Sequence, residues 1–309
     1  MTRAVVFAYH GVGVRCLKVL IAQGVEIPLV VTHADDPGES IWFDSVARTA
    51  ADLGVPVIAP ADPNAPAVVE RIAECKPDFV FSFYYRLMLK APLLALAPRG
   101  ALNMHGSLLP KYRGRVPVNW AIIHGETETG ATLHYMTEEP DAGDIVAQSS
   151  VTILPDETAK EVFDKVALAA ERTLAGVLPA LIAGTAPRVP QDLSRGAYFG
   201  GRKPEDGVID WSRDAVSIHN LVRALAPPYP GARTTLRGHP ARVLRTRVVV
   251  AAAPVPATPS LAVEGDLIVA RCGGGGTLAI LDLEIDGTTV PADKLAAACG
   301  AAPILLPRR

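Results

Sequence analysis

The sequence has few cysteines, no excess of charge of one sign and no long hydrophobic run. Its four cysteines stand apart, at Cys16, Cys75, Cys272 and Cys299. They form neither a C-x-x-C pair nor the dense framework of a small secreted protein. The cysteines therefore predict reduced thiols in a cytosolic protein and argue against a zinc or redox site.

Charge and hydropathy exclude two further classes. Thirty lysines and arginines stand against 32 aspartates and glutamates, a net charge of −2. A chain that wraps nucleic acid needs a strong positive excess, so we expect no nucleic-acid partner, although a local basic patch is compatible with this balance. Apolar runs such as residues 248–253 fall far short of the ~20 residues that a membrane span needs. Residues 4–8 are too few for a signal-peptide core, and we expect a soluble, cytoplasmic protein without a membrane partner.

The length of 309 residues predicts two domains, at about 150 residues each. In the first part of the chain, short apolar runs alternate with helical patterns, which predicts an α/β fold with a parallel sheet and helices on both faces. The expected strands are 4–8, 27–32, 55–59, 79–83 and 101–105, followed by a hairpin of 132–136 and 145–151 and a long helix over 159–182.

The pattern changes after Pro187. Residues 196–207 hold four glycines and a proline, which is typical of a boundary. Short β-rich runs at 241–250, 266–270 and 277–285 then predict a small antiparallel barrel. We therefore expect a catalytic domain over 1–203 and a second domain over 204–309.

Gly11-x-Gly13 after the first strand is only weak support for a dinucleotide-binding site. The full G-x-G-x-x-G pattern needs a small residue where Cys16 stands, and Thr32-His33 provides no acid for a ribose. These glycines are better explained as residues that open a tight turn between strand and helix.

Asn103 and His105 lie two residues apart on a predicted strand, so they share one face at its carboxyl end. An amide that stabilises an oxyanion beside an imidazole that moves a proton suits acyl chemistry. Asp141 lies in the acidic turn 138–144. If this turn folds back onto the face of Asn103 and His105, Asp141 would orient the imidazole and stabilise its protonated form. Otherwise Asp141 belongs to a solvated loop. Residues 111–115 carry three cationic side chains. They could bind an anionic ligand, or they could belong to a solvated basic loop.

The remaining candidates are less specific. His124, His134 and His219 have no metal-ligand spacing, so no metal site is predicted. An arginine cluster in the second domain fits phosphate or RNA, but it fits the outer face of a small barrel equally well. Its members are Arg233, Arg237, Arg242, Arg245 and Arg247.

Four motifs in this order resemble the N10-formyltetrahydrofolate-dependent formyltransferases. They are Asn103-x-His105, the run 107–114 (SLLPKYRG), Asp141-Ala142-Gly143 and Pro228-Tyr229-Pro230-Gly231-Ala232. The resemblance covers nearly the whole chain. It implies a Rossmann-like catalytic domain followed by a smaller, OB-like β-barrel domain.

The resemblance also implies roles. Asn103, His105 and Asp141 would be catalytic, acting on the co-substrate N10-formyltetrahydrofolate without a metal. The folate would contact Leu87, Met88, Leu89 and Arg115, and the loop formed by Thr137, Glu138, Glu139, Pro140 and Asp141.

Further motifs, among them 81–86 (FSFYYR) and 32–39 (THADDPGE), are similar to formyltransferases that act on UDP-4-amino-4-deoxy-L-arabinose in lipid A modification and polymyxin resistance. Such enzymes form one half of a bifunctional chain whose other half is an NAD-dependent decarboxylase. No room is left for that half here, so we expect an excised domain or a separate decarboxylase partner. Another nucleotide amino sugar and methionyl-tRNA are the alternative acceptors, and the sequence does not indicate the oligomeric state.

Overall fold

The computed structural model describes residues 1–251, 255–256, 258–299 and 302–307. The chain divides into two units. The first comprises residues 1–117, 128–152 and 163–200, and the second comprises 118–127, 153–162 and 201–309. The division expected from the sequence, at residues 203 and 204, remains a proposal. The first unit contains the predicted site, and the second contains the predicted barrel.

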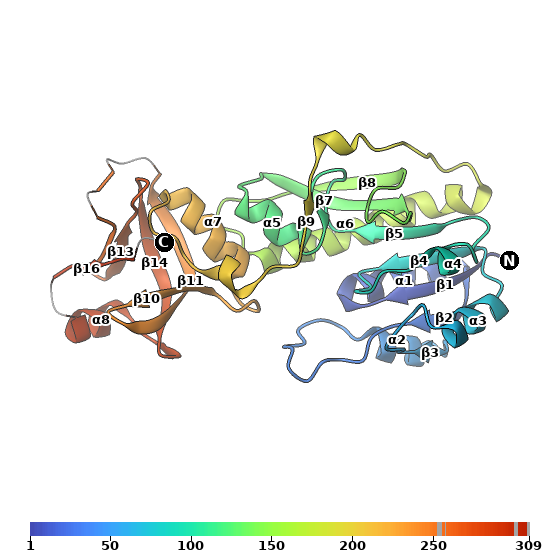
Figure 1. The fold of residues 1–309 in the computed structure, drawn as a ribbon, viewed down its shortest axis with the longest axis horizontal. Coiled ribbons are helices and arrows are strands. Elements are labelled where there is room, and N and C mark those ends of the chain that lie inside the picture. Colours follow the sequence, from blue (N-terminus) through green and yellow to red (C-terminus); the bar gives the residue numbers. More distant parts are fainter. Residues whose placement is uncertain (252–254, 257, 300–301, 308–309) are drawn as a thin grey trace. The chain divides into compact units, whose positions relative to one another are not determined.

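A seven-stranded sheet forms the first unit (Figure 1), in the order β3-β2-β1-β4-β5-β7-β8. The first five strands of this order pair in parallel, whereas β7 is antiparallel to both β5 and β8. The Rossmann-like prediction is confirmed. The hairpin expected over 132–136 and 145–151 is present as β7 and β8, and it adds an antiparallel edge to the parallel part of the sheet. A short turn joins β7 to β8, and such a connection leaves no room for a crossover helix between parallel strands. The strands are β1 (Arg3–Ala8), β2 (Glu26–Val31), β3 (Val57–Ile58), β4 (Phe79–Phe83), β5 (Ala101–His105), β7 (Glu128–Tyr135) and β8 (Ile145–Thr152).

The central strands are largely apolar because helices cover both faces of a parallel sheet, so side chains on either face are buried. Every residue of β4 is buried, and one core cluster joins Val5, Phe7, Leu29 and Val80 to Leu93. Figure 1 shows helices on the two sides of this sheet. They are α1 (His10–Ala22), α2 (Val46–Asp52), α3 (Pro66–Glu74), α4 (Ala91–Leu94) and α6 (Ala159–Ala183), most of which belongs to this unit. The next helix along the chain after α4, α5 (Pro117–Ile123), falls almost wholly in the second unit.

The glycines after β1 do not form the open turn that the sequence suggested. Gly11 and Gly13 lie inside the first turns of α1, which begins directly at His10. A Cβ at position 13 would stand 3.0 Å from the Ala8 Cβ and 3.1 Å from Val46. Glycine therefore allows α1 to pack closely against the end of β1.

Helix α6 has the length and hydropathy of a membrane span, but its burial pattern is that of a core helix. Val162, Val166, Ala170, Leu174 and Leu178 are fully buried and recur every four residues, which forms one apolar stripe. Beside this stripe the Thr173 hydroxyl donates to Ser149 on β8 over 2.7 Å.

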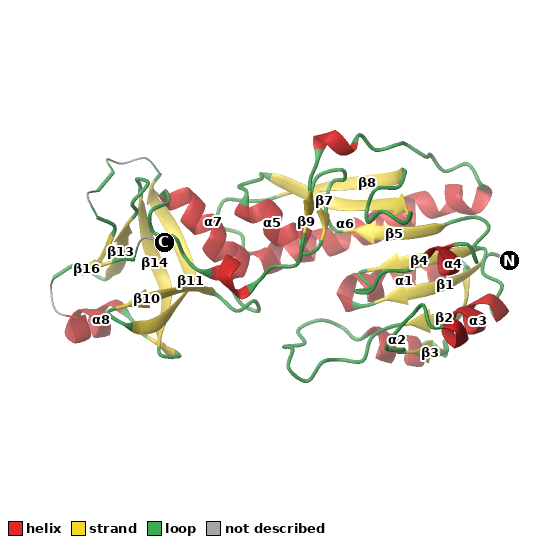
Figure 2. Cartoon of the chain, in the orientation of Figure 1, coloured by secondary structure: helices red, strands yellow, loops and turns green. Residues whose placement is uncertain are grey.

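The second unit contains a curled antiparallel sheet (Figure 2), in the order β10-β11-β14-β13-β12-β16, with β15 paired to β14. This confirms the predicted OB-like domain. Its core centres on Trp211, which is fully buried and donates from Nε1 to the Thr234 hydroxyl over 2.8 Å. The elements are α7 (Ala215–Leu225), β10 (Ala232–Leu236), β11 (His239–Val250), β12 (Ser260–Glu264), β13 (Leu267–Arg271), β14 (Thr277–Ile285), β15 (Thr288–Thr289), α8 (Ala292–Cys299) and β16 (Ile304–Leu305).

Two short strands in the first unit complete the part of the fold that holds the site. Strand β6 (Arg113–Gly114) pairs in parallel with β9 (Tyr198–Phe199). The segment expected to be a boundary therefore also holds the loop after β5. Cys16, Cys75 and Cys272 are free thiols, while the Cys299 side chain lies outside the described residues.

Gly130 provides a test of how tightly the β7–β8 hairpin is packed. A Cβ there would lie 2.1 Å from the Ser149 carbonyl oxygen, so Gly130→Ala must push the strands apart. We expect a loss of about 1–3 kcal/mol in the free energy of unfolding, measured by urea denaturation. Gly176→Ala is the matched control, because this exposed helical glycine has no atom within 4 Å of the added methyl. The control should gain up to ~1 kcal/mol, and equal effects of the two variants would contradict this account.

Candidate active site

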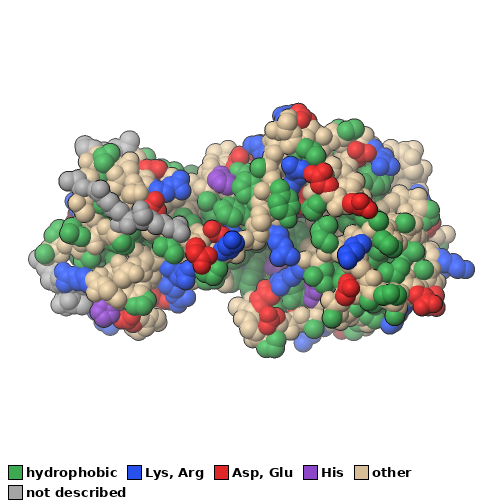
Figure 3. Space-filling view, in the orientation of Figure 1, with side chains coloured by type: hydrophobic (Ala, Val, Ile, Leu, Met, Phe, Trp, Pro, Cys, Tyr) green, Lys and Arg blue, Asp and Glu red, His purple; other side chains and the backbone are tan. Residues whose placement is uncertain are grey.

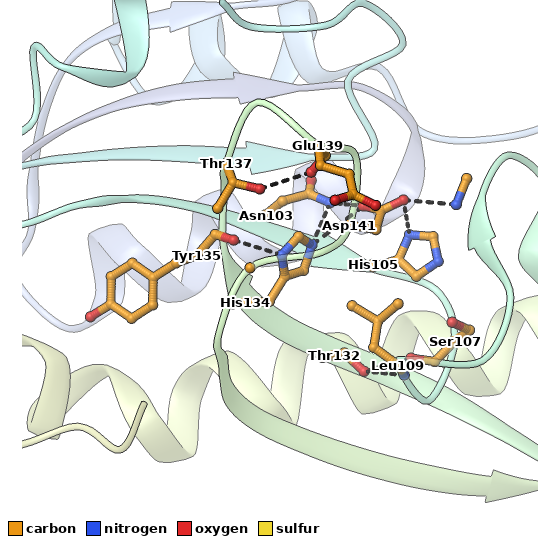
Figure 4. A network of polar contacts seen from close by, with 12 residues as sticks. Asn103, His105, Ser107, Leu109, Thr132, His134, Tyr135, Thr137, Glu139 and Asp141 are labelled. Carbon is orange, nitrogen blue, oxygen red and sulfur yellow. Dashed lines mark hydrogen bonds and ion pairs between the residues drawn. The ribbon is translucent and has the colours of Figure 1, made fainter. Parts of the chain in front are cut away.

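Asn103 and His105 lie at the carboxyl end of β5, where the period of the strand places them on one face (Figure 4). His105 is the last residue of the strand and only 6% exposed, and Asn103 is half-buried. The structure therefore places both side chains at the sheet edge where ligands of open α/β folds bind.

The turn between β7 and β8 brings Asp141 to this pair. Asp141 Oδ2 lies 3.5 Å from His105 Nδ1 and accepts a hydrogen bond from the Gly114 backbone N–H over 2.8 Å. Asp141 Oδ1 accepts from Asn103 Nδ2 over 3.3 Å. The acidic turn thus reaches the face of Asn103 and His105, and its central carboxylate is 12% exposed.

Local contacts fix this turn in place. A Cβ at Gly143 would stand 2.0 Å from the Tyr135 carbonyl oxygen, so only glycine permits the close approach. Asp141 itself has a φ of +54°, a left-handed conformation that aspartate adopts more readily than most residues. The Gln191 amide donates to the carbonyls of Asp141 and Gly143 over 3.0 and 2.6 Å. The carboxylate is therefore held by its backbone as well as by its own partners.

His134 is a site residue that the sequence did not indicate. It stands opposite Asn103 in the β5–β7 register and is 1% exposed. Its Nε2 atom lies 3.2 Å from Asn103 Nδ2 and 3.4 Å from Asp141 Oδ1 (Figure 4). The signal that could have found it is the pattern Thr132-x-His134, which repeats the spacing of Asn103-x-His105 on the neighbouring strand.

The two imidazole rings are held in the same way. His105 Nε2 lies 2.8 Å from the Tyr112 carbonyl oxygen, and His134 Nδ1 lies 2.9 Å from the carbonyl oxygen of Tyr135. Because a carbonyl only accepts, each of these nitrogens must carry a hydrogen. The other nitrogen of each ring faces Asp141, so a proton that either ring gains is bound beside the carboxylate.

Opposing effects determine the charge of Asp141. Burial alone would raise the pKa of this carboxyl group. Three neighbours lower it: His105 through its charge, His134 through its charge and a hydrogen bond, and Gly114 through its N–H. Together they hold the pKa of Asp141 below its ordinary value. Asp141 is therefore ionised throughout the neutral range.

The residues expected to contact folate differ in exposure. Leu87 and Met88 follow β4 and are 40% and 52% exposed, so their side chains are available to an apolar ligand. Leu89 is 5% exposed and belongs to the core cluster of the sheet, so its side chain packs in the interior. Arg115 donates from Nη2 to the Arg86 carbonyl over 3.2 Å.

The loop over 137–141 is exposed at Thr137, Glu138 and Glu139, and half-buried at Pro140 and Asp141. The Thr137 hydroxyl donates to the Glu139 carbonyl over 2.9 Å. Arg113 is 9% exposed and pairs with Glu139 over 3.3 Å, so the basic run 111–115 is only partly a solvated loop. This ion pair ties the loop after β5 to the turn that carries Asp141.

The arrangement contains an amide donor, two imidazoles and one carboxylate. Such a set can stabilise an oxyanion and move a proton, and it suits attack by an external nucleophile. Across the described ranges, no group of three or more His, Cys, Asp or Glu side chains is arranged to hold a metal ion.

Asp141 should make stability depend on acid pH. Its folded pKa lies below the ordinary value, so its contribution is present at neutral pH and is lost as the pH falls below about 4. We expect Asp141→Asn to lose about 1–3 kcal/mol in the free energy of unfolding at pH 7, since hydrogen bonds to a charged group are lost. The deficit should shrink between pH 5 and the most acid pH at which both proteins stay folded. Urea denaturation against pH checks this, and a deficit that does not change with pH would contradict it.

Comparison with known proteins identifies the family. Residues 17–178 match the formyl transferase family, and residues 202–299 match the C-terminal domain of formyl transferases. Among solved structures, an N-formyltransferase from Helicobacter canadensis, in complex with folinic acid and dTDP-3-aminofucose, has a TM-score of 0.73 at 19% identity, covering 91% of this chain and 99% of that one.

Two other structures have a similar fold. A 4-N formyltransferase from Francisella tularensis has a TM-score of 0.63 at 22% identity, covering 77% of this chain and 95% of that one. HypX from Aquifex aeolicus, in complex with tetrahydrofolic acid, has a TM-score of 0.64 at 17% identity, covering 99% of this chain and 51% of that one. The first family match alone spans more than half of the 309 residues, and the chain belongs to the formyl transferase family.

Proposed function

We propose that this formyltransferase transfers a formyl group from N10-formyltetrahydrofolate to the 4-amino group of UDP-4-amino-4-deoxy-L-arabinose, in the cytoplasm. The observation that carries the proposal is the convergence of Asn103, His105 and His134 on one ionised carboxylate, Asp141. The folate ligands of the Helicobacter canadensis and Aquifex aeolicus proteins support the donor, and the dTDP-sugar of the former supports a nucleotide-linked amino sugar as acceptor.

The reaction needs one proton to be moved and one oxyanion to be stabilised. The acceptor amine attacks the formyl carbon, and the carbonyl oxygen becomes negative. Asn103 Nδ2 donates to this oxygen, a contact typically worth about 3 kcal/mol of barrier. His105 takes the proton that the amine loses. When the bond from the formyl carbon to N10 breaks, that proton is delivered to N10, and free tetrahydrofolate and the formamide leave.

Two features of the free enzyme suit these roles. The contacts of Asn103 Nδ2, at 3.2 and 3.3 Å, are longer than the usual 2.9–3.0 Å, so an N–H can be redirected to the substrate at little cost. His105 Nε2 is bound to the Tyr112 carbonyl, which leaves Nδ1 as the nitrogen that exchanges a proton. Asp141 fixes the ring and balances its charge.

The donor would bind beside these groups. Leu87 and Met88 offer exposed apolar side chains for a pterin, and the buried Leu89 anchors the segment that carries them. Arg115 and the exposed loop 137–139 offer the polar contacts, and Pro140 and Asp141 continue that loop into the catalytic centre.

The main rival acceptors are another nucleotide-linked amino sugar, such as a dTDP sugar, and methionyl-tRNA. A tRNA would need the arginine cluster of the second unit. In the structure that cluster is partly neutralised, because Arg242 pairs with Glu284, and Arg245 stands opposite Asp282 across the β11–β14 ladder. The face seen in Figure 3 likewise shows acidic and basic side chains near one another rather than one continuous basic patch. These observations favour a sugar acceptor.

An acceptor panel tests the proposal. Purified protein and N10-formyltetrahydrofolate are incubated in turn with UDP-4-amino-4-deoxy-L-arabinose, a dTDP-linked amino sugar and methionyl-tRNA, and each product is analysed by mass spectrometry. We expect one added formyl group on the UDP sugar. If the protein prefers the dTDP sugar or the tRNA, that compound is the acceptor in place of the UDP sugar. If no formyl group is transferred to any of the three, the proposed function is refuted.

Asn103→Ala is the control for the panel. It removes the oxyanion donor without a large change in volume, and turnover should fall at least about 10²-fold while the thermal midpoint stays near that of the wild type. A variant with near-wild-type turnover would remove Asn103 from the mechanism.

His134 should act by holding Asn103 and Asp141. His134→Leu removes the Nε2 atom and should lower kcat about tenfold, the effect of one lost hydrogen bond, with little change in the donor KM. His134→Gln keeps a polar amide near Asn103 and should recover part of the rate. Steady-state kinetics over a pH series measure both variants, and an unchanged kcat in His134→Leu would show that the ring only fills space.

A further inference from the structure

Arg86 connects three parts of the first unit through three different groups. Its backbone N–H donates to His33 Nε2 over 3.0 Å. Its guanidinium makes a bidentate ion pair with Glu39, with both contacts at 2.6 Å. Its carbonyl accepts from Arg115 Nη2 over 3.2 Å. We call this set of contacts the Arg86 junction.

One side of the junction is the segment 32–45, which joins β2 to α2 without helix or strand. Irregular connections of this length are uncommon inside a domain and usually have a function. A second contact ties this segment to the same sheet edge, because the Tyr9 hydroxyl donates to Asp35 over 2.8 Å while the Arg86 guanidinium lies 4.6 Å above the Tyr9 ring. Burial and the hydrogen bond to Asp35 raise the pKa of Tyr9 to about 12, so its hydroxyl keeps its proton.

His33 completes that side of the junction. Its ring stacks on Tyr85 at 4.1 Å and accepts from the Arg86 N–H, so Nε2 must be unprotonated. Burial and the charge of Arg86 lower the pKa of His33, which favours the neutral ring that the hydrogen bond requires. The backbone and the side chain of Arg86 are therefore both tied to segment 32–45, through His33 and Glu39.

The other side of the junction is the segment expected to bind the donor. Leu87 and Met88 follow Arg86 directly, and Asn64 holds their far end by donating to the Met88 carbonyl over 2.9 Å and accepting from the Lys90 N–H over 2.8 Å. The segment is thus held at both ends, with the two exposed side chains between them.

Stability alone gives little reason for the Arg86–Glu39 pair. The two side chains are 45% and 33% exposed, and exposed ion pairs contribute at most about 1 kcal/mol to folding. The Arg15–Glu171 pair of the same unit has the same 2.6 Å distance and exposures of 45% and 37%, but it joins two helices away from the donor segment. It provides a matched reference for an ion pair that only stabilises.

We propose that Arg86 is a positioning residue for the formyl donor, which sets Leu87, Met88 and Arg115 for binding and couples them to segment 32–45 through Glu39. This inference rests on the proposed function, because it takes these residues as the donor site. Arg86 acts through its neighbours, so its loss should weaken donor binding and leave the chemical step intact.

Direct binding of folinic acid, measured by titration calorimetry on the full chain, tests the inference. Arg86→Met keeps the stem and removes the guanidinium, and it should raise the Kd for folinic acid about tenfold. Glu39→Gln should raise it several-fold, and the double variant should bind no more weakly than Arg86→Met, because both changes break one contact. Glu171→Gln and Arg15→Met, the controls, should stay within twofold of the wild type.

Kinetics separate positioning from a general loss of structure. In Arg86→Met the donor KM should rise in parallel with the Kd, while kcat at saturating donor and the acceptor KM stay within about twofold of the wild type. Arg86→Lys, which keeps the charge but not the bidentate geometry, should lie in between. If Arg86→Met fails to fold, Arg86→Lys and Glu39→Gln carry the test.

The outcomes are distinct. Unchanged folinic acid binding in Arg86→Met, or an equal loss in the Arg15–Glu171 controls, would overturn the positioning role while leaving the proposed function in place. A fall in kcat with an unchanged donor KM would also overturn it. A wild-type protein that binds no folinic acid would refute the proposed function, and this inference with it.

Discussion

The arrangement of the site depends on one buried carboxylate. Removing Asp141 from water is costly, and that cost is offset by the Asn103 amide and the Gly114 backbone N–H, which donate to it, and by each imidazole beside it when that ring is protonated. These four partners come from three parts of the chain: Asn103 and His105 from β5, His134 from β7 and Gly114 from β6. Satisfying this one charge therefore fixes the relative positions of three segments that are distant in the sequence.

The antiparallel edge of the sheet makes this possible. Because β7 pairs antiparallel to β5, His134 stands directly opposite Asn103, and the turn that follows β7 returns to the carboxyl end of β5. The β6–β9 pair holds Gly114, whose N–H completes the ligands of Asp141. A sixth parallel strand would require a crossover connection and would carry that turn away from His105.

Much of the fold followed from local patterns. Buried strands and the long helix were predictable from apolar runs and spacing, and Asn103 and His105 from the period of a strand. The approach of Asp141 to His105 depends on how the turn folds, which composition alone left open between a site and a solvated loop. His134 was missed because its role depends on strand register, a non-local property. The burial of Leu89 and Arg113 likewise depends on neighbours that are remote in sequence.

The charge of the cluster gives a physical reason for its composition. With both rings neutral, Asp141, His105 and His134 carry one negative charge in a largely buried place. In the proposed reaction, taking up one proton from an attacking amine would bring the three groups to neutrality, whereas the same proton on an isolated buried imidazole would create an unpaired charge. Each ring offers Asp141 the one nitrogen that is not bound to a backbone carbonyl, so the new charge forms next to its counter-ion. The Gly114 N–H stays bound to Asp141 while His105 gains and loses its proton, so the carboxylate keeps its place through the proposed transfer.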